Sequence, residues 1–194
     1  MKEKDIILGV SGASGVILSY YLAKAIREQG RRLHLVLSDA ARLTWELETR
    51  LSLQELTGLA DVFYEPQDMS AEIASGSFFT EGMIVAPCSM KTLAGIVTGY
   101  TDNLLLRAVD VCLKEGRKVV LCPREMPLSR LHLKNLYAAA QLGCGIVPPM
   151  LSFYGGQETV EDQLHHIVGK ILMQYNMSYD RFRPWKGNVR SERQ

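Results

Sequence analysis

Glycines, serines and basic residues recur directly after the apolar runs of this 194-residue chain. The first run leads into GVSGASG, residues 9–15, in which Ser11 and Ser14 alternate with glycines. Backbone N–H groups and hydroxyls at the start of a helix bind anions well, so this turn is suited to a phosphate group. The structural alternative is a tight turn that only needs positive φ angles. A position directly after the first predicted strand favours the phosphate interpretation.

The end of the second apolar run argues against a dehydrogenase. A nicotinamide-binding fold places Asp or Glu there for the ribose hydroxyls, whereas this chain has Ser38, followed by Asp39. The glycine spacing also departs from G-x-G-x-x-G. Ser38 either caps the next helix or contacts a mononucleotide.

The third run ends in APCSMKT, which brings Ser89, Lys91 and Thr92 to the start of a helix. A second anion or flavin contact is expected there. Cys88 in this motif suggests a nucleophile, but no histidine lies near it in the sequence. A buried structural thiol is the favoured interpretation.

Further charged residues lie at or near the end of the fourth run. The sequence CPREMP holds Arg124 and Glu125 between two prolines, where the carboxylate is able to act as a base and the guanidinium to bind a phosphate oxygen. A loop salt bridge is the alternative. Arg107 and Lys114 are seven residues apart on one predicted helix and therefore share a face. Taken alone, they are two surface charges. Spacing alone assigns no role to Tyr154, Lys170, Trp185 or the histidines.

The apolar runs alternate with segments of helical period, which predicts a single α/β domain with a Rossmann-like, flavodoxin-like open parallel sheet and helices on both faces. Strands are predicted at residues 5–10, 33–38, 83–88, 119–122 and 145–147. Helices are predicted at residues 15–29, 40–48, 103–115, 128–142 and 160–175, with a short helix at 53–60 that leads into an irregular stretch. The domain spans residues 1–176. Residues 177–194 form a tail whose aromatics indicate docking near the active site or on a neighbouring subunit.

The amino-acid composition argues against some classes of binding partner. The hydrophobic fraction is 47%, the charged fraction 22% and the net charge +1, so no broad field favours nucleic acid or an anionic membrane. The N-terminal apolar run is too short for a signal peptide or a spanning helix, and a cytoplasmic protein is expected. The four cysteines lack zinc spacing, and reduced, buried thiols are expected.

Several motifs occur together in one order: GASG, SGSF at residues 75–78, PCSMKTLAGI, RAVDVCLKEGRK, PREMPLS, PPM and FY. From about Lys4 to Trp185 the chain resembles the UbiX/Pad1 family of flavin prenyltransferases. This resemblance implies transfer of a dimethylallyl group from dimethylallyl monophosphate to N5 and then C6 of reduced FMN. The product is prenylated FMN, the cofactor of UbiD-type aromatic acid decarboxylases. Relatives form homododecamers.

The resemblance also implies site residues. FMN would contact Gly12, Ala13, Ser14, Ser38, Ser89, Met90, Lys91, Thr92 and Arg124. The prenyl phosphate would contact Ser75, Arg107, Lys114, Glu125, Tyr154 and Lys170. Catalysis would rest on Ser14, Lys114, Glu125 and Trp185, with Ser14 and Glu125 assisting proton movements and Trp185 closing over the site. Lys170 stands where many relatives have Arg.

The residues add one observation to the resemblance. No D-D-x-x-D motif is present for magnesium, which favours a metal-free monophosphate site built from Lys, Arg, Ser and Tyr. Two alternatives remain. One is an FMN-dependent decarboxylase of the related cysteine decarboxylase family, which the PCSMKT sequence and the lack of a histidine between His34 and His132 disfavour. The other is an FMN-carrying subunit, which would not need Lys114, Glu125 and Tyr154.

Overall fold

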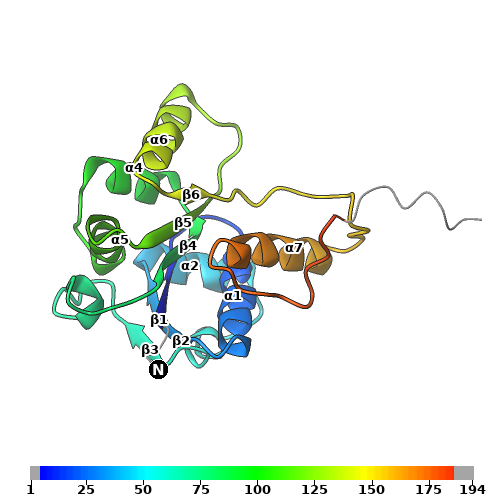
Figure 1. Ribbon diagram of the computed structural model, residues 1–194, viewed down its shortest axis with the longest axis horizontal. Coiled ribbons are helices and arrows are strands. Elements are labelled where there is room, and N and C mark those ends of the chain that lie inside the picture. The colour runs from blue at the N-terminus through cyan, green and yellow to red at the C-terminus, as the bar shows by residue number, and fades with distance from the viewer. Residues whose placement is uncertain (1–4, 186–194) are drawn as a thin grey trace, which may run out of the picture.

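The computed structural model describes residues 5–185, and its centre is a six-stranded sheet (Figure 1). The strands are β1 (Asp5–Val10), β2 (Arg32–Leu37), β3 (Val62–Tyr64), β4 (Gly82–Cys88), β5 (Lys118–Pro123) and β6 (Gly145–Ile146). The helices are α1 (Ile17–Glu28), α2 (Asp39–Glu48), α3 (Leu53–Thr57), α4 (Met90–Thr98), α5 (Leu104–Lys114), α6 (Arg130–Gln141) and α7 (Val160–Met173), with the 3₁₀ turn η1 (Glu72–Ala74). The central strands are apolar almost throughout because both of their faces are buried.

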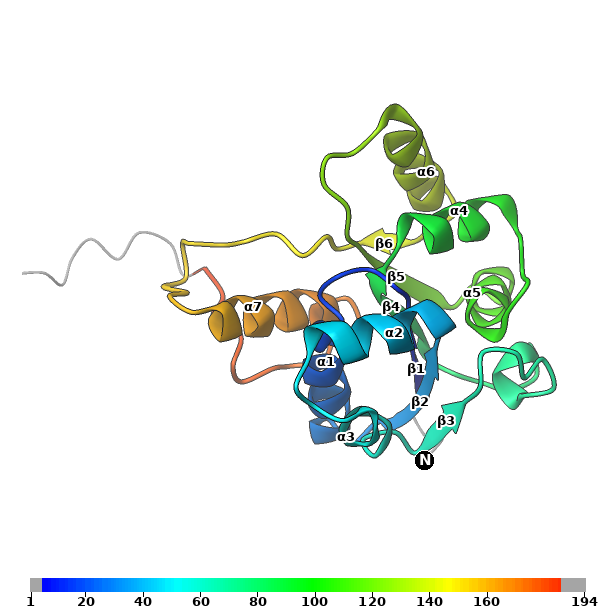
Figure 2. The same ribbon diagram turned by 180° about the vertical axis from the view of Figure 1, so that it is seen from behind.

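The sheet is parallel throughout, in the order β3-β2-β1-β4-β5-β6, and the predicted fold class is confirmed. Helices α1 and α7 pack together on one face, whereas α4, α5 and α6 cover the other (Figures 1 and 2). Each face has its own core of buried residues. The strand order reverses between β1 and β4, which is where ligands bind in open α/β sheets.

The stretch after α3 is not irregular as predicted, because it contains the edge strand β3. Three residues are too few for a periodic signal, and two of them are only half-buried. The strand forms because β2 offers an open edge, with His34 opposite Val62 and Val36 opposite Tyr64. Whether a short apolar sequence forms a strand at a sheet edge depends on the neighbouring strand more than on its own residue pattern.

Two segments extend away from the sheet. Helix α6 buries only Ala139 among its own residues, and the chain between β6 and α7 runs as a long arm (Figure 1). After α7 the chain returns along that helix, where Tyr179 Oη lies 2.6 Å from His165 Nδ1. A Cβ atom on Gly169 would meet the Phe182 ring, so glycine admits this contact. Docking of the tail on another subunit stays a prediction.

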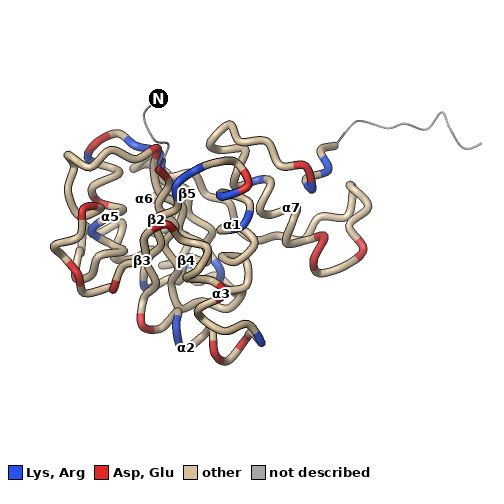
Figure 3. The backbone as a smooth tube through the Cα atoms, turned by 90° about the horizontal axis from the view of Figure 1, so that it is seen from below, with Lys and Arg blue, Asp and Glu red and all other residues tan. Residues whose placement is uncertain are grey.

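Charges of both signs are interspersed along the backbone in the view of Figure 3. Within residues 5–185 no helix is long and apolar enough to cross a membrane. All four cysteines are free and buried.

Candidate active site

The loop after β1 is held against the loop after β4 by one serine. Ser11 is 1% exposed; its hydroxyl donates to the Pro87 carbonyl over 2.9 Å and accepts from the Ser89 N–H over 2.7 Å. The expectation that the Ser11 hydroxyl faces an anion is therefore wrong, because both of its hydrogen bonds are internal. Ser14 in the same loop is half-buried.

The glycines of this loop serve two different needs. A Cβ atom on Gly12 would lie 2.4 Å from the Ala40 Cβ, so glycine lets the start of α2 pack directly on the loop. Gly15 has a φ of 92°, which side chains rarely adopt. Its N–H donates over 2.7 Å to Oε2 of Glu48, the last residue of α2.

Glu48 was not among the predicted site residues. It places a carboxylate on the N–H of Gly15, the residue after Ser14, within the loop predicted to bind a phosphate. No local pattern could have found it, because the contact joins positions 33 residues apart in the sequence. Only the packing of α2 across the loop brings the carboxylate there.

Five of the nine predicted FMN residues line one cavity of about 330 Å³ at the carboxyl ends of β1, β2 and β4: Gly12, Ser38, Ser89, Lys91 and Thr92. The N-termini of two helices open onto it, since Ser38 caps α2 and Ser89 caps α4. These helix N-termini and Lys91 suit a phosphate monoester, and the carboxylates of Asp39 and Asp102 also line the cavity. These residues therefore fit the phosphate end of FMN.

Arg124 and Glu125 lie one strand further along the same edge. Glu125 is exposed, and its Oε1 accepts the N–H of Met126 over 3.0 Å. Within residues 5–185 no ion pair joins Arg124 to Glu125, so the loop salt bridge weighed as an alternative is absent there. Both side chains line a largely apolar cavity of about 610 Å³ below α6.

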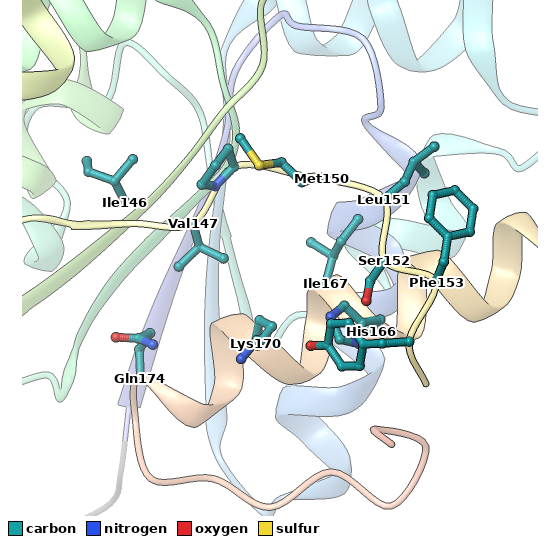
Figure 4. A pocket seen from close by; sticks show the side chains of 12 residues that line it. Ile146, Val147, Met150, Leu151, Ser152, Phe153, His166, Ile167, Lys170 and Gln174 are labelled. Atoms are coloured by element: carbon teal, nitrogen blue, oxygen red, sulfur yellow. The ribbon is translucent and has the colours of Figure 1, made fainter. Parts of the chain in front are cut away.

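A neighbouring cavity of about 450 Å³ lies between the arm and α7, and Tyr154 and Lys170 line it. Figure 4 shows Lys170 and His166 on one helix, across the cavity from the arm, with His166 beside Ser152. The two cavities share Ile146, Pro148, Met150 and Leu151, so they adjoin. Glu125 therefore lines one of two adjoining cavities, and Tyr154 and Lys170 line the other.

Tyr154 is held between two aromatic side chains. Its ring lies edge-on to His166 and to Trp185, with centroids 5.7 Å apart in both pairs. Burial and the charge of Lys170 lower the pKa of His166, so that this imidazole is neutral at pH 7. Sequence reasoning assigned nothing to His166, because its role depends on an aromatic contact twelve residues away.

The remaining predicted phosphate residues lie elsewhere. Arg107 donates from Nε to the Ala74 carbonyl over 3.1 Å, next to Ser75, and Lys114 forms an ion pair with Glu115. These residues belong to α5 and the loop after η1, on the face opposite α7 (Figure 1). One chain thus does not bring all six predicted phosphate residues together, because the sheet separates Arg107 and Lys114 on α5 from Lys170 on α7.

The structural interpretation of Cys88 is confirmed. Its side chain is fully buried, and burial raises the pKa of the thiol far above its usual range. A thiol that stays protonated in the core is no nucleophile at neutral pH.

Comparison with known proteins agrees with this geometry. The Flavoprotein family model matches residues 1–172. A probable UbiX-like flavin prenyltransferase of Sedimentibacter hydroxybenzoicus is 53% identical over 183 residues, covering 94% of this chain and 97% of that protein. This chain belongs to the UbiX-like flavin prenyltransferase family.

Solved structures of the family superpose closely on this chain. A dodecameric FMN-dependent UbiX-like decarboxylase from Escherichia coli O157:H7 gives a TM-score of 0.93 at 50% identity, covering 94% of this chain and 100% of that one. AnUbiX (PadA1), in complex with FMN and dimethylallyl pyrophosphate, gives 0.94 at 38% identity, covering 96% and 100%. The FMN-dependent cysteine decarboxylase SpaF, at 16% identity, covering 76% of this chain and 84% of that one, and with a TM-score of 0.60, shares the fold alone.

Proposed function

We propose that the protein is a flavin prenyltransferase that joins the dimethylallyl group of dimethylallyl monophosphate to N5 and C6 of reduced FMN. The observation that carries this proposal is that cavities lined by the predicted site residues follow one another along the carboxyl edge of the sheet. A cavity lined by helix N-termini and Lys91 lies at the strand-order reversal. Two adjoining cavities, one lined by Glu125 and the other by Tyr154 and Lys170, follow one strand away. Family membership supports the same reaction.

FMN would lie across the ends of β1 and β4. Ser38, Ser89 and Thr92, with Lys91 beside them, would bind its phosphate, and Gly12, Ala13 and Ser14 would contact the flavin ring from the β1 loop. Met90 and Arg124 would complete the site. The reduced flavin supplies the nucleophilic nitrogen and carbon. Ser14 and Glu125 would move the protons that ring closure requires, and the Glu48 carboxylate, bound by the Gly15 N–H, would serve as a further proton acceptor.

The prenyl phosphate would bind in the two adjoining cavities. Tyr154 and Lys170 would hold the leaving phosphate, and the Trp185 ring would stabilise positive charge on the allylic carbon as the C–O bond breaks. Because Ser75, Arg107 and Lys114 lie across the sheet, we propose that a second copy of the chain supplies them. Several large apolar side chains on α6 and the arm are exposed and would be covered in an oligomer: Leu131, Leu133, Tyr137, Met150, Leu151 and Phe153.

We further propose that the reaction needs no metal. Within the described part of the chain, no group of three His, Cys, Asp or Glu side chains is placed to hold a metal ion. Lysine and arginine would neutralise the phosphate instead. The product would serve a UbiD-type decarboxylase, and four free thiols fit a reducing, cytoplasmic location.

The deciding experiment is anaerobic incubation of the protein with reduced FMN and dimethylallyl monophosphate in the presence of EDTA. Mass analysis of the bound flavin should show the added C5 unit, and inorganic phosphate should be released in equal amount. If the flavin stays unmodified and no phosphate is released, with and without added Mg²⁺, the protein only carries flavin and the proposal is wrong. Product that forms only with added Mg²⁺ would overturn metal independence alone.

A further inference from the structure

The loop that carries Ser75 has its carbonyl groups bound by two arginines. The Ala74 carbonyl accepts from Arg107 Nε over 3.1 Å. Arg117 donates from Nη2 to the Gly76 carbonyl over 2.6 Å and from Nη1 to the Phe78 carbonyl over 2.7 Å. One guanidinium thus binds two carbonyls of alternate residues, and the neighbouring arginine binds the carbonyl before them. We name residues 74–78 the clamped loop.

Buried side chains of the sheet support the inner side of the clamped loop. The Tyr64 hydroxyl donates to Glu72 over 2.9 Å, and His34 Nδ1 lies 2.8 Å from the same hydroxyl. His34 is fully buried, and its ring lies 5.2 Å from that of Phe78. The loop is therefore fixed beneath by the sheet and above by guanidinium groups.

The outer side of the loop presents groups suited to an anion. The Ser75 and Ser77 hydroxyls lie 2.8 Å apart, and the Ser77 N–H donates to Ser75 Oγ over 3.3 Å. Lys114 and its ion-pair partner Glu115 both lie over Gly76, where a Cβ atom would meet the Glu115 carboxylate first and the Lys114 Nζ at 2.8 Å. Hydroxyls and two cations are thus gathered around one short turn. Arg107 is paired with Asp110 over 2.8 Å and Lys114 with Glu115, so a bound phosphate would compete with these carboxylates.

We infer that Arg117 is a positioning residue for the anion subsite formed by Ser75, Ser77, Arg107 and Lys114. Its own donors point to the two carbonyls, so it acts through the shape of the loop rather than by touching the phosphate. The planar guanidinium donates to the two carbonyl oxygens from two separate nitrogens in a fixed geometry, whereas a lysine would bring a single nitrogen on a flexible stem. This inference rests on the proposed function, in which the subsite receives the prenyl phosphate of a neighbouring chain.

The test compares Arg117→Lys and Arg117→Gln with the wild-type protein. We expect the KM for dimethylallyl monophosphate to rise about tenfold or more, because misplacing a binding group by about 1 Å is costly. The kcat should change much less, and the Kd for FMN should stay as in the wild type. Arg27→Lys is the matched control, since Arg27 also donates to a loop carbonyl, that of Leu59, over 2.8 Å. It should leave the KM unchanged.

A purely structural role gives a different pattern. If Arg117→Lys lowers the melting temperature as Arg27→Lys does and keeps the wild-type KM, the inference is wrong. Arg117→Lys keeps the charge, and the conclusion rests on this variant if Arg117→Gln does not fold.

Failure of the proposed function is recognised separately, because the wild type then forms no product. Calorimetric titration with dimethylallyl monophosphate then tests Arg117 directly. Weaker binding to Arg117→Lys than to the wild type supports the inference, and equal or absent binding overturns it.

Discussion

Glu125 stands at the end of β5 with its carboxylate exposed to the largely apolar cavity below α6 rather than paired with Arg124. In the proposed reaction this carboxylate moves a proton, and such groups contribute about 10²–10⁴-fold to rates. Glu125→Gln should therefore bind FMN normally and form product at least about 100-fold more slowly. Single-turnover measurement of prenylated flavin checks this. Glu46→Gln, on the exposed side of α2, is the control, and equal rates for both variants would remove Glu125 from the mechanism.

Lys170 contributes a single ammonium to the cavity beside Tyr154, 5.9 Å from the Phe182 ring. An arginine there would bind a phosphate with two parallel hydrogen bonds. Lys170→Arg should lower the KM for dimethylallyl monophosphate several-fold at similar kcat. Lys24→Arg is a matched control, because Lys24 also lies over an aromatic ring, that of Tyr20, at 5.3 Å. A KM that rises or stays constant in Lys170→Arg would place the phosphate elsewhere.

At the scale of elements, the FMN cavity depends on how closely α2 approaches the β1 loop. Gly12→Ala would put a methyl group 2.4 Å from Ala40 and 2.8 Å from its carbonyl carbon, so α2 must move away and take Ser38 with it. We expect the Kd for FMN to rise at least about tenfold, because FMN loses its contacts with the N-terminus of α2 and with the Ser38 hydroxyl. Fluorescence titration with FMN measures this.

Gly145→Ala supplies the control for this prediction. Its Cβ atom would meet nothing nearer than 3.5 Å, and it lies on β6, away from the cavity. FMN should bind this variant as it binds the wild type. Unchanged affinity in Gly12→Ala would mean that α2 does not shape the flavin site.

For the whole molecule, the sheet itself predicts that the active site is shared. Arg107 lies on α5 on one face of the sheet, Lys170 lies on α7 on the opposite face, and Glu125 follows the end of β5 at the edge between them. Arg107→Ala and Glu125→Ala should each lose most activity alone. Mixed oligomers that contain both variants should regain a part of it, because some sites then combine two intact halves.

Co-expression of the two variants with different tags isolates the mixed oligomer. Its turnover is compared with that of each pure variant. Activity that stays at the level of the single variants would show that one chain supplies the whole site.

The buried thiols predict how stability depends on pH. Burial raises the pKa of Cys112 and Cys144 to about 11 and that of Cys122 to about 12, against 9.0 for an ordinary thiol. Below pH 9 both the folded and the unfolded chain keep these protons, so they contribute no pH dependence. Above pH 9 the unfolded chain releases protons that the folded chain retains, and the free energy of unfolding falls until the folded thiols ionise.

Urea unfolding between pH 8 and pH 11 measures this decrease, which reaches at most about 1.4 kcal/mol per pH unit for each thiol. Cys144→Ser should flatten the curve by the share of one thiol. A free energy of unfolding that stays constant from pH 8 to pH 11 would contradict the prediction.

The sequence determined the fold class, most of the elements and the residue types at the strand ends. Buried parallel strands need continuous apolar runs, and the residues that follow them face one common edge, so these features are local. The sequence alone therefore predicts that Ser38, Ser89 and Lys91 share one edge of the sheet, and they line one cavity there. The sequence did not predict the edge strand β3, because its three residues carry no periodic signal.

Only the tertiary structure decided which polar groups are used internally and which remain for a ligand. It turned the Ser11 hydroxyl inward, placed Glu48 on the Gly15 N–H and set Arg117 on the clamped loop. It also separated Arg107 and Lys114 from Lys170 by the thickness of the sheet. Each of these outcomes joins positions far apart in the sequence, and the packing of helices on two faces of the sheet, not local residue pattern, decides where such positions meet.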